Sequence, residues 1–587
     1  MTSWLILAAA MMLQQAPEFH QGVDYTVEAV LDTSTHVLRG RERIRYVNKS
    51  SAKIDTIWFH LHLNAFRPNS AWARRELQFN NRRFQDLGPA DHAYERIRSV
   101  RVGGRPVRVV YPGAPDSTVM GVPLPTPLNP GMSVSMLIDW SARLSTLPRR
   151  QGRRDHHYDF AQWYPRVAVY DRGGWQVQPL LPQGEFYGEF ATYNVTLEVP
   201  GSYVVGATGV PVTGDPGWEA ANINKANRVE YRRDAYDAGP VESLGLFDRK
   251  LNARNKRIHW RAEQVHHFAW TTNPHYVYEG GKAGNTLVHA LFLPSDSNWA
   301  GVAVQRTARA IQFLESVFGP YVYPQITNVH RVEGGGGTEF PMMIMDASSG
   351  EGLIVHEIAH QWAHGILGNN EWKDGWLDEG MASFVGNLYA EAAGQRLNYA
   401  AMLQGVARAD TAAGARPVAT PSADFKDMQS YSVMTYSKPA LVFRMLQHLL
   451  GDEVFRAGMK RYYEENKLEH VDEEDFKRAM EEASKQDLDW FFQQWLHTNH
   501  TLDYAVGSAT TAQANGKWRT RVDITRSGQA WMPVELKVGD VVQRLDSRES
   551  NFSVTVETTT RPTEVVIDPN IVLIDLDRQN NLKVISN

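Results

Sequence analysis

The stretch His356-Glu357-Ile358-Ala359-His360 decides how the rest of this chain is interpreted. Positions i and i+4 of a helix share one face, so the two histidines can bind one metal ion together. Glu357 stands beside the first histidine, where it can take a proton from a metal-bound water. After His360 come eighteen residues and then Glu379, a third candidate ligand. Three protein ligands plus a water form the open coordination of a catalytic zinc site, whereas a structural site is closed.

Two other residues compete with Glu379 for the position of third ligand. His364 lies eight residues from His356. That separation is a rise of about 12 Å along a helix, which is too far for both to reach one ion. Asp378 directly precedes Glu379, and spacing alone does little to separate these two acids. An apolar helical pattern starts at Met381, and a helix there, packed on the first one, would deliver the Glu379 carboxylate.

The helix that carries the two histidines has predicted ends. Ser348-Ser349-Gly350-Glu351 offers a hydroxyl cap with a glutamate three residues on, so the helix is expected to start there. Gly368-Asn369-Asn370 is expected to end it. Without this context, the same motif could be a buried helix with two structural histidines. The neighbouring pairs His156-His157 and His266-His267 are also interpreted as structural, because adjacent residues of a strand face opposite ways.

A second informative segment is the glycine run 334–337, which precedes Glu339. Glycine has no Cβ, so Gly336 and Gly337 would let a peptide approach the backbone closely. The run lies between two apolar strand patterns, which suits an edge strand to which a peptide can add. Glu339 would then offer a carboxylate to a charged amine. The alternative is a solvated acid on a flexible loop.

These motifs resemble, in order and spacing, those of the gluzincin zinc aminopeptidases, the family of aminopeptidase N. H-E-x-x-H, followed after eighteen residues by the glutamate of W-L-D-E-G, is similar to the zinc motif of that family. Residues 336–340 resemble its G-x-M-E-N motif, and residues 435–440 resemble its Y-x-K-G-A segment. Thr338, Phe340 and Pro439 replace the family's Met, Asn and Gly. The first two changes put the shape of the first substrate pocket in doubt.

The resemblance, which covers about residues 265–500 strongly, implies a role for each matching residue. Three residues would bind one Zn²⁺ per chain: His356, His360 and Glu379. Glu357 would be the general base, and the hydroxyl of Tyr436 would stabilise the oxyanion. Glu339 would bind the free α-amine of the substrate, together with Gln162 or, as an alternative, with Glu185.

The implied function is a zinc-dependent aminopeptidase that hydrolyses the N-terminal bond of peptides with a free amine. The amine anchor fixes how far the chain can enter, so one residue is removed at a time. A zinc endopeptidase is one rival, and it would cleave N-acetylated peptides. An epoxide hydrolase, known in one branch of the resembled family, is another, although no feature of the sequence points to it. The third is a non-catalytic scaffold, which would have no need of an intact set of ligands, base and tyrosine.

Composition is typical of a globular enzyme. The 587 residues, 43% hydrophobic and 22% charged, suffice for several cores. With a formal net charge of −5 and no basic patch, nucleic acid is not an expected partner. The chain has no cysteine, which rules out disulfides, thiolate ligands and cysteine catalysis.

Targeting information is expected only at the N-terminus. Residues 5–13 are apolar, too few to span a membrane, and suit the core of a signal peptide. Residues 1–16 are therefore predicted to be a signal peptide, with the protein periplasmic or secreted. The alternative is a docked apolar N-terminus in a cytoplasmic protein. No other stretch predicts a transmembrane span.

The rest of the chain is predicted to be a multidomain α+β protein with three regions. Residues 17–273 alternate in strand-like patterns and predict an N-terminal antiparallel β domain. Residues 274–499 turn helical and are expected to form a thermolysin-like, α-rich catalytic domain. Residues 500–587 predict a small β-sandwich. The resembled family continues into a large helical domain that this chain lacks, so its cleft is expected to be more open, or closed by a second subunit of a homo-oligomer.

Overall fold

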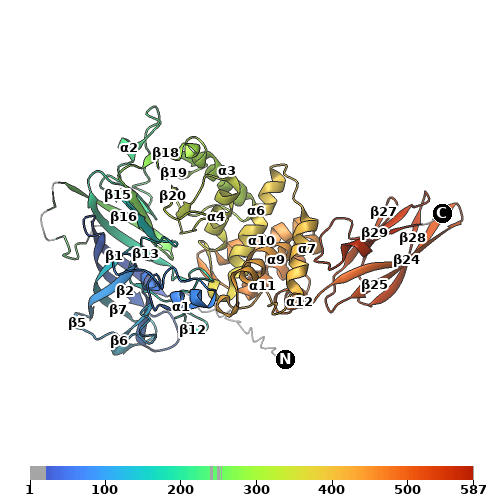
Figure 1. Ribbon diagram of the computed structural model, residues 1–587, viewed down its shortest axis with the longest axis horizontal. Coiled ribbons are helices and arrows are strands. Elements are labelled where there is room, and N and C mark those ends of the chain that lie inside the picture. The colour runs from blue at the N-terminus through green and yellow to red at the C-terminus, as the bar shows by residue number, and fades with distance from the viewer. Residues whose placement is uncertain (1–20, 238, 240–241, 248–250, 253, 586–587) are drawn as a thin grey trace, which may run out of the picture.

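Figure 1 shows the protein, a computed structural model that describes residues 21–237, 239, 242–247, 251–252 and 254–585. Three regions follow one another along the long axis: strands at one end, helices in the middle, and a second set of strands at the other end. The predicted signal peptide, residues 1–16, lies outside the described residues. No described helix is both long and apolar enough to cross a membrane.

The N-terminal region is built on an eight-stranded sheet. Its strands alternate as their period-2 pattern predicts, so that in β2 (Val37–Val47) the side chains of Leu38, Ile44 and Tyr46 are buried. Neighbouring strands are antiparallel except β1 and β13, which are far apart in the sequence and run parallel. In sheet order the strands are β15 (Val210–Thr213), β16 (Asn255–Val265), β13 (Ala191–Pro200), β1 (Gly22–Asp32), β2, β7 (Ser133–Arg143), β4 (Tyr94–Val102) and β5 (Arg105–Pro106).

Smaller sheets connect this region to the helices. The hairpin of β8 (Gly152–Arg154) and β9 (His157–Phe160) pairs through β17 (Trp270–Asn273) with β14 (Val204–Ala207). Phe160 and Trp270 stack there with ring centroids 4.1 Å apart, which fixes the hairpin on the core. The remaining elements of this region are η1 (His62–Ala65), α1 (Ala71–Gln78), β3 (Ile54–His60), β6 (Val119–Leu128), β10 (Arg166–Val167), β11 (Tyr170–Asp171), β12 (Gly174–Trp175) and α2 (Trp218–Ala221).

The middle region holds a four-stranded sheet whose outer edge carries the glycine run. The order is β18 (Val277–Ala283), β19 (Thr286–Phe292), β20 (Gln325–His330) and β21 (Met343–Asp346), and the last three are parallel. The strands β20 and β21 are the two that the sequence predicts on either side of the run. Beyond β21, Thr338 and Met345 exchange backbone hydrogen bonds of 3.0 and 2.9 Å. Residues 336–338 therefore run antiparallel to β21 along the edge of the sheet.

Helix α4 (Glu351–Ala363) carries both motif histidines and packs against α3 (Ala303–Val317) and α6 (Met381–Ala392). The predicted hydroxyl cap was wrong: Gly350 is the N-cap and no side chain bonds to the first turn, because the Ser349 hydroxyl donates to the carbonyl of Asn298 instead. The helix also ends earlier in the chain than the sequence predicts. The helix stops at Ala363, and the chain then enters β22 (Leu367–Asn369), which pairs with β23 (Glu469–Val471).

Further helices complete the middle region around this pair. They are α5 (Glu371–Gly375), α7 (Tyr399–Asp410), α8 (Met428–Ser432), α9 (Lys438–Leu450), α10 (Asp452–Asn466), α11 (Glu473–Ser484) and α12 (Asp489–Leu496), with the short 3₁₀ turns η2 (Ser297–Trp299) and η4 (Ser422–Asp424). Among them, α9 packs on α6, and α10 packs on α9, α11 and α3.

The C-terminal region consists of two sheets. Val522, Ile524 and Leu536 are buried between the strands, which alternate as the sequence predicts. The arrangement of strands, helices and strands confirms the predicted multidomain α+β class. One sheet contains β24 (Asp503–Ala514), β25 (Lys517–Ser527) and β28 (Asn551–Thr558); the other contains β27 (Val541–Leu545), β26 (Val534–Val538), β29 (Glu564–Ile567) and β30 (Leu582–Val584), preceded by the turn η6 (Arg578–Asn581).

Candidate metal and peptide site

Three side-chain atoms converge beside helix α4. His356 Nε2 lies 3.2 Å from His360 Nε2 and 3.2 Å from Glu379 Oε2, and His360 Nε2 lies 3.3 Å from Glu379 Oε2. The i, i+4 spacing on α4 brings the two imidazoles together. Glu379 comes from the π-helical turn η3 (Trp376–Gly380), which leads directly into α6. The packing of α6 on α4 therefore delivers the carboxylate.

This donor triangle fits a zinc ion. Two ligands of a tetrahedral ion, at bonds of about 2.0–2.1 Å, lie about 3.3–3.4 Å from each other. Imidazole nitrogen and carboxylate oxygen are also the donors that catalytic zinc takes. Burial raises the pKa of Glu379, but the charge of His360 and hydrogen bonds from both histidines outweigh burial and hold that pKa well below its usual value. The carboxylate is therefore ionised, as a ligand must be.

Asp378, the rival of Glu379 in the sequence, lies on the other side of His360. Its Oδ1 hydrogen-bonds to His360 Nδ1, the ring nitrogen that does not take part in the donor triangle. Carboxylates commonly hold metal-binding histidines in this way, fixing the ring and leaving Nε2 for the ion. Although burial opposes it, the charges of Asp378 and Glu379 raise the pKa of His360. The geometry favours Glu379 over Asp378 as third ligand.

His364, the other rival, is buried away from the donor triangle. Its Nδ1 lies 3.0 Å from Glu371 Oε1. Its ring also belongs to a buried group of three imidazoles with His266 and His267. The guanidinium of Arg166 contacts His267 there, and its positive charge opposes a metal ion at that point. We therefore interpret these histidines as structural.

Glu357 packs against the glycine run. A Cβ added at Gly337 would lie 2.2 Å from Glu357 Cδ, so only glycine fits at this position. Gly336 has φ of +65°, in the left-handed region that also favours glycine. Burial raises the pKa of Glu357 well above its usual range. The structure thus brings the predicted base and the predicted peptide-binding strand into direct contact.

Arg331 holds the glycine run in place from behind. Its Nη1 donates to the carbonyl of Gly337 at 2.9 Å and to the hydroxyl of Thr338 at 2.8 Å, and its Nη2 donates to the carbonyl of Gly335. The guanidinium is 4% exposed, and Glu333 lies 3.8 Å away as a counter-charge. Thr338, which stands where the resembled family has Met, gains a hydrogen-bond partner in this way.

Tyr436 comes from a second π-helical turn, η5 (Val433–Ser437), which precedes α9. Its hydroxyl donates a hydrogen bond to Glu379 Oε1 and so lies beside the donor triangle. Burial, and then the charge of Glu379, raises the pKa of Tyr436 well above its usual value, so the phenol keeps its proton and can donate it. A buried ion pair of 2.6 Å between Lys438 and Asp410 ties the start of α9 to α7. Turns of the π type occur frequently at functional sites.

A group of buried carboxylates adjoins the site. Oxygen atoms of Glu185, Glu339 and Glu371 all lie within 4.8 Å of one another. Glu339 Oε1 has no hydrogen-bond partner among the described residues. Burial raises the pKa of Glu339 to about 7. Carboxylates held together away from water are stabilised by a cation, so this group is suited to bind one.

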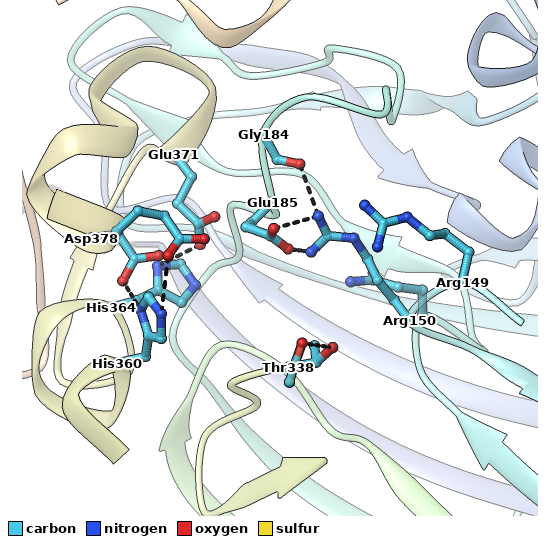
Figure 2. Close-up of polar contacts among 12 residues, drawn as sticks. Arg149, Arg150, Gly184, Glu185, Thr338, His360, His364, Glu371 and Asp378 are labelled. Carbon is cyan, nitrogen blue, oxygen red and sulfur yellow. Dashed lines mark hydrogen bonds and ion pairs between the residues drawn. The ribbon is translucent and has the colours of Figure 1, made fainter. Parts of the chain in front are cut away.

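Arg150 supplies part of that positive charge (Figure 2). Its guanidinium forms an ion pair with Glu185 and donates to the carbonyl of Gly184 at 3.3 Å. Glu371 points instead toward Asp378 and His364, on the side of the metal ligands. One guanidinium among three carboxylates leaves negative charge that a further cation can neutralise.

Gln162, a predicted amine contact, is engaged elsewhere. Its Oε1 lies 3.0 Å from His62 Nδ1, and within the described part of the chain no hydrogen bond joins it to Glu339. The alternative from the sequence, Glu185, is the residue that the structure brings to Glu339. Sequence reasoning missed Glu371, which starts the short helix α5 and belongs to no motif. Arg150 and Arg331 were missed for the same reason.

Residues 342–495 match the family described as Peptidase family M1 domain. The chain carries an M1 domain. This confirms the resemblance that the sequence motifs indicate. Over 226 residues, 36% of this chain, it is 28% identical to aminopeptidase N of Mus musculus. Over 149 residues, 24% of this chain, it is 32% identical to glutamyl aminopeptidase of Bitis rhinoceros. These matches span 20% and 16% of the lengths of the two relatives.

Solved structures share the fold of this chain. An M1 zinc metallopeptidase from Deinococcus radiodurans superposes with a TM-score of 0.55 at 17% identity, covering 82% of this chain and 95% of that one. Legionella pneumophila aminopeptidase A, solved with aspartic acid, superposes with a TM-score of 0.65 at 12% identity, covering 96% of this chain and 60% of that one. At these identities the likeness concerns the fold.

Proposed function

We propose that this protein is a zinc-dependent aminopeptidase. The observation that carries the proposal is the buried carboxylate of Glu339, unpartnered at one oxygen among the described residues and placed beside a zinc-like donor triangle. The M1 domain supports a metallopeptidase. Among structures similar to this chain, one of the Deinococcus protein holds a Tyr-Ser-Ala substrate, which supports peptides as substrates.

Each residue of the site has a defined part in hydrolysis. His356, His360 and Glu379 would hold one Zn²⁺, which when bound supplies Lewis acidity and activates water. Glu357 accepts a proton at its carboxylate and delivers it to the leaving amide nitrogen. Tyr436 donates its hydroxyl to the carbonyl oxygen as that oxygen gains negative charge.

The substrate ammonium is the cation that completes the carboxylate group. Glu339, with Glu185 and Glu371 close by, can accept charge-assisted hydrogen bonds from it. The chain beyond the amine can then lie along residues 335–337 as an added strand. Anchoring the amine one residue away from Glu357 restricts cleavage to the first peptide bond. Without that anchor the same groups would serve an endopeptidase.

A substrate panel tests the proposal. Aminoacyl fluorogenic amides and short peptides, each with a free and an acetylated amine, would be compared with the zinc-loaded protein. We expect the free-amine substrates to be cleaved far faster than the acetylated ones. Equal cleavage of acetylated and free peptides would contradict the aminopeptidase proposal and would favour a zinc endopeptidase instead.

Metal analysis of four variants tests the ligand assignment. His356→Ala and Glu379→Ala should lose zinc, because each removes a donor of the triangle. Asp378→Ala should lower the metal affinity by about 10–100-fold, the usual effect of losing a group that orients a ligand. His364→Gln should retain stoichiometric zinc. Full zinc in Glu379→Ala, with loss in His364→Gln, would show that the wrong third ligand was chosen.

A further inference from the structure

We propose that the cleft contains a second anchor, which binds the C-terminal carboxylate of short peptides. The site is a cavity of about 770 Å³ whose lining includes Arg154, His275 and Gly334. The proposal rests on the proposed aminopeptidase function, because the amine anchor at Glu339 sets the direction of the substrate.

Two fixed points set that direction. The substrate amine belongs at Glu339, and the bond to be cleaved belongs next to Glu357, which packs on Gly337. A peptide that passes both points runs along the glycine run from Glu339 to Gly337 and onward to Gly334. It therefore runs opposite to the glycine run itself, which is the antiparallel pairing that a free sheet edge accepts. Its C-terminal end points away from the carboxylate group.

The onward path ends in the cavity. Gly334 is three residues beyond Gly337. It is therefore at most about 10 Å away, because Gly335 and Gly336 have positive φ and bend the run. A substrate residue advances by about 3.3 Å. The third residue after the cleaved bond, which is the fourth residue of the peptide, thus reaches at least as far as Gly334. Glu333 and Gly334 line the cavity, so the glycine run and the cavity are continuous.

Three parts of the fold form the cavity walls. The turn between β8 and β9 supplies Arg154 and His156, and the loop after β17 supplies His275. The carboxyl ends of the parallel strands β19 and β20 form the facing wall, with Leu293 and His330. The cavity therefore lies between the N-terminal β region and the catalytic sheet, at the Gly334 end of the glycine run.

The guanidinium and an imidazole of the cavity are available to a ligand. Arg154 and His275 are exposed, and among the described residues neither side chain takes part in a hydrogen bond or an ion pair. The acid Glu333 is already engaged, because it accepts from the Arg149 guanidinium at 3.4 Å and from the backbone N–H of Arg150 at 2.6 Å.

Two further acids lie in or near the cavity, Asp296 and Asp155. His330 is paired at 2.6 Å with Asp296, so that carboxylate is engaged as well. Asp155 is the remaining acid of the lining, and it faces the Arg154 guanidinium and the imidazoles of His156 and His275, which can donate hydrogen bonds. A carboxylate entering here meets the Arg154 guanidinium and imidazole N–H donors, whereas an ammonium entering at Glu339 meets carboxylates. The cleft is complementary to a zwitterionic peptide of about four residues.

Peptide length and C-terminal charge test the proposal. The tetrapeptide Ala-Ala-Ala-Ala and the dipeptide Ala-Ala would each be prepared as free acid and as C-terminal amide. For the tetrapeptide we expect kcat/KM of the acid to exceed that of the amide by about fivefold, the upper range for an exposed ion pair. Ala-Ala-Ala-Asp-amide tests whether an acidic side chain at the fourth position serves equally well.

A double variant locates the effect. Arg154→Met with His275→Gln should reduce the acid-to-amide ratio of the tetrapeptide to about one and leave the ratio of the dipeptide unchanged, because the dipeptide ends before the cavity. Arg98→Met is the matched control, since Arg98 is an exposed arginine on β4 outside the cavity. It should leave both ratios unchanged.

The outcomes separate this proposal from the aminopeptidase proposal. A tetrapeptide ratio that is the same in the wild type and the double variant overturns the carboxylate anchor, as does an equal loss for acid and amide. Acetylated Ala-Ala-Ala-Ala reports on the amine anchor alone. If it is cleaved as well as the free-amine peptide, the amine anchor fails, whatever the acid-to-amide ratio shows.

Discussion

The two ends of the cleft differ in burial as well as in charge. At the Glu339 end, three carboxylates are buried, and one of them, that of Glu185, is paired with the guanidinium of Arg150. At the Arg154 end, the cations are exposed and the nearby acids are mostly engaged. A buried charge without a partner costs several kcal/mol, whereas an exposed ion pair contributes about 0–1 kcal/mol. We therefore expect the acidic end to control whether a peptide is cleaved and the basic end to adjust which lengths are preferred.

The largest effect should come from the base at the acidic end. Glu357→Gln preserves shape but removes the proton acceptor, and general base catalysis is worth about 10²–10⁴-fold. kcat should fall by that factor for tetrapeptide acid and amide alike, while metal analysis shows zinc retained. Near-normal turnover in the zinc-loaded variant would remove Glu357 from the mechanism.

Tyr436→Phe should have the next largest effect. Its hydroxyl bonds to Glu379 in the resting structure and would serve the substrate oxygen only once charge develops there. Loss of such a donor costs about 10²–10³-fold in kcat, with little change in KM. Steady-state kinetics beside a thermal unfolding curve distinguishes this from a packing role, which would alter stability and spare kcat.

The glycine run connects the two ends of the cleft, and Gly337 and Gly334 can be substituted as a test and its control. A Cβ at Gly337 would meet Glu357 at 2.2 Å, whereas a Cβ at Gly334 would meet nothing within 4 Å. Gly337→Ala should therefore displace the base or the strand, and a misplacement of this size costs about 10²-fold. The loss should be equal for free and acetylated substrates, while Gly334→Ala remains active. Similar activity of the two variants would contradict the direct contact between strand and base.

Glu339→Ala tests the amine anchor and should discriminate between substrates. Truncating one member of a buried charge pair costs about 2–5 kcal/mol. We expect the lower part of that range, about 30-fold in kcat/KM, because Glu185 and Glu371 remain nearby. The ratio of free-amine to acetylated cleavage should fall by this factor. Glu333→Gln, at the other end of the run, should leave the ratio unchanged. An unchanged ratio in Glu339→Ala would show that Glu339 does not bind the substrate amine.

Much of the fold follows from local pattern. Alternation in β2 and in the C-terminal strands predicts sheets, and the pattern from Met381 predicts α6, because side-chain direction repeats every two residues in strands and every 3.6 in helices. The ends of α4 were predicted less well. Ser348 and Ser349 have the right residue type for a cap, but Ser349 bonds to Asn298 from a distant turn instead. The parallel pairing of β1 with β13 likewise joins segments that no local pattern relates.

In the candidate site too, some features follow from the local sequence and others from tertiary packing. The sequence by itself determined that His356 and His360 share a face with Glu357 beside them, because helix geometry fixes i and i+4 whatever surrounds the helix. Only the tertiary structure brought Glu379, and not Asp378, to the two Nε2 atoms, and Glu185, and not Gln162, to Glu339.

Tertiary structure alone also brought Glu371 to the carboxylate group and opened the cavity at Arg154. These choices depend on how separate elements pack. Packing is set by contacts between residues distant in the chain, whose positions no local period encodes.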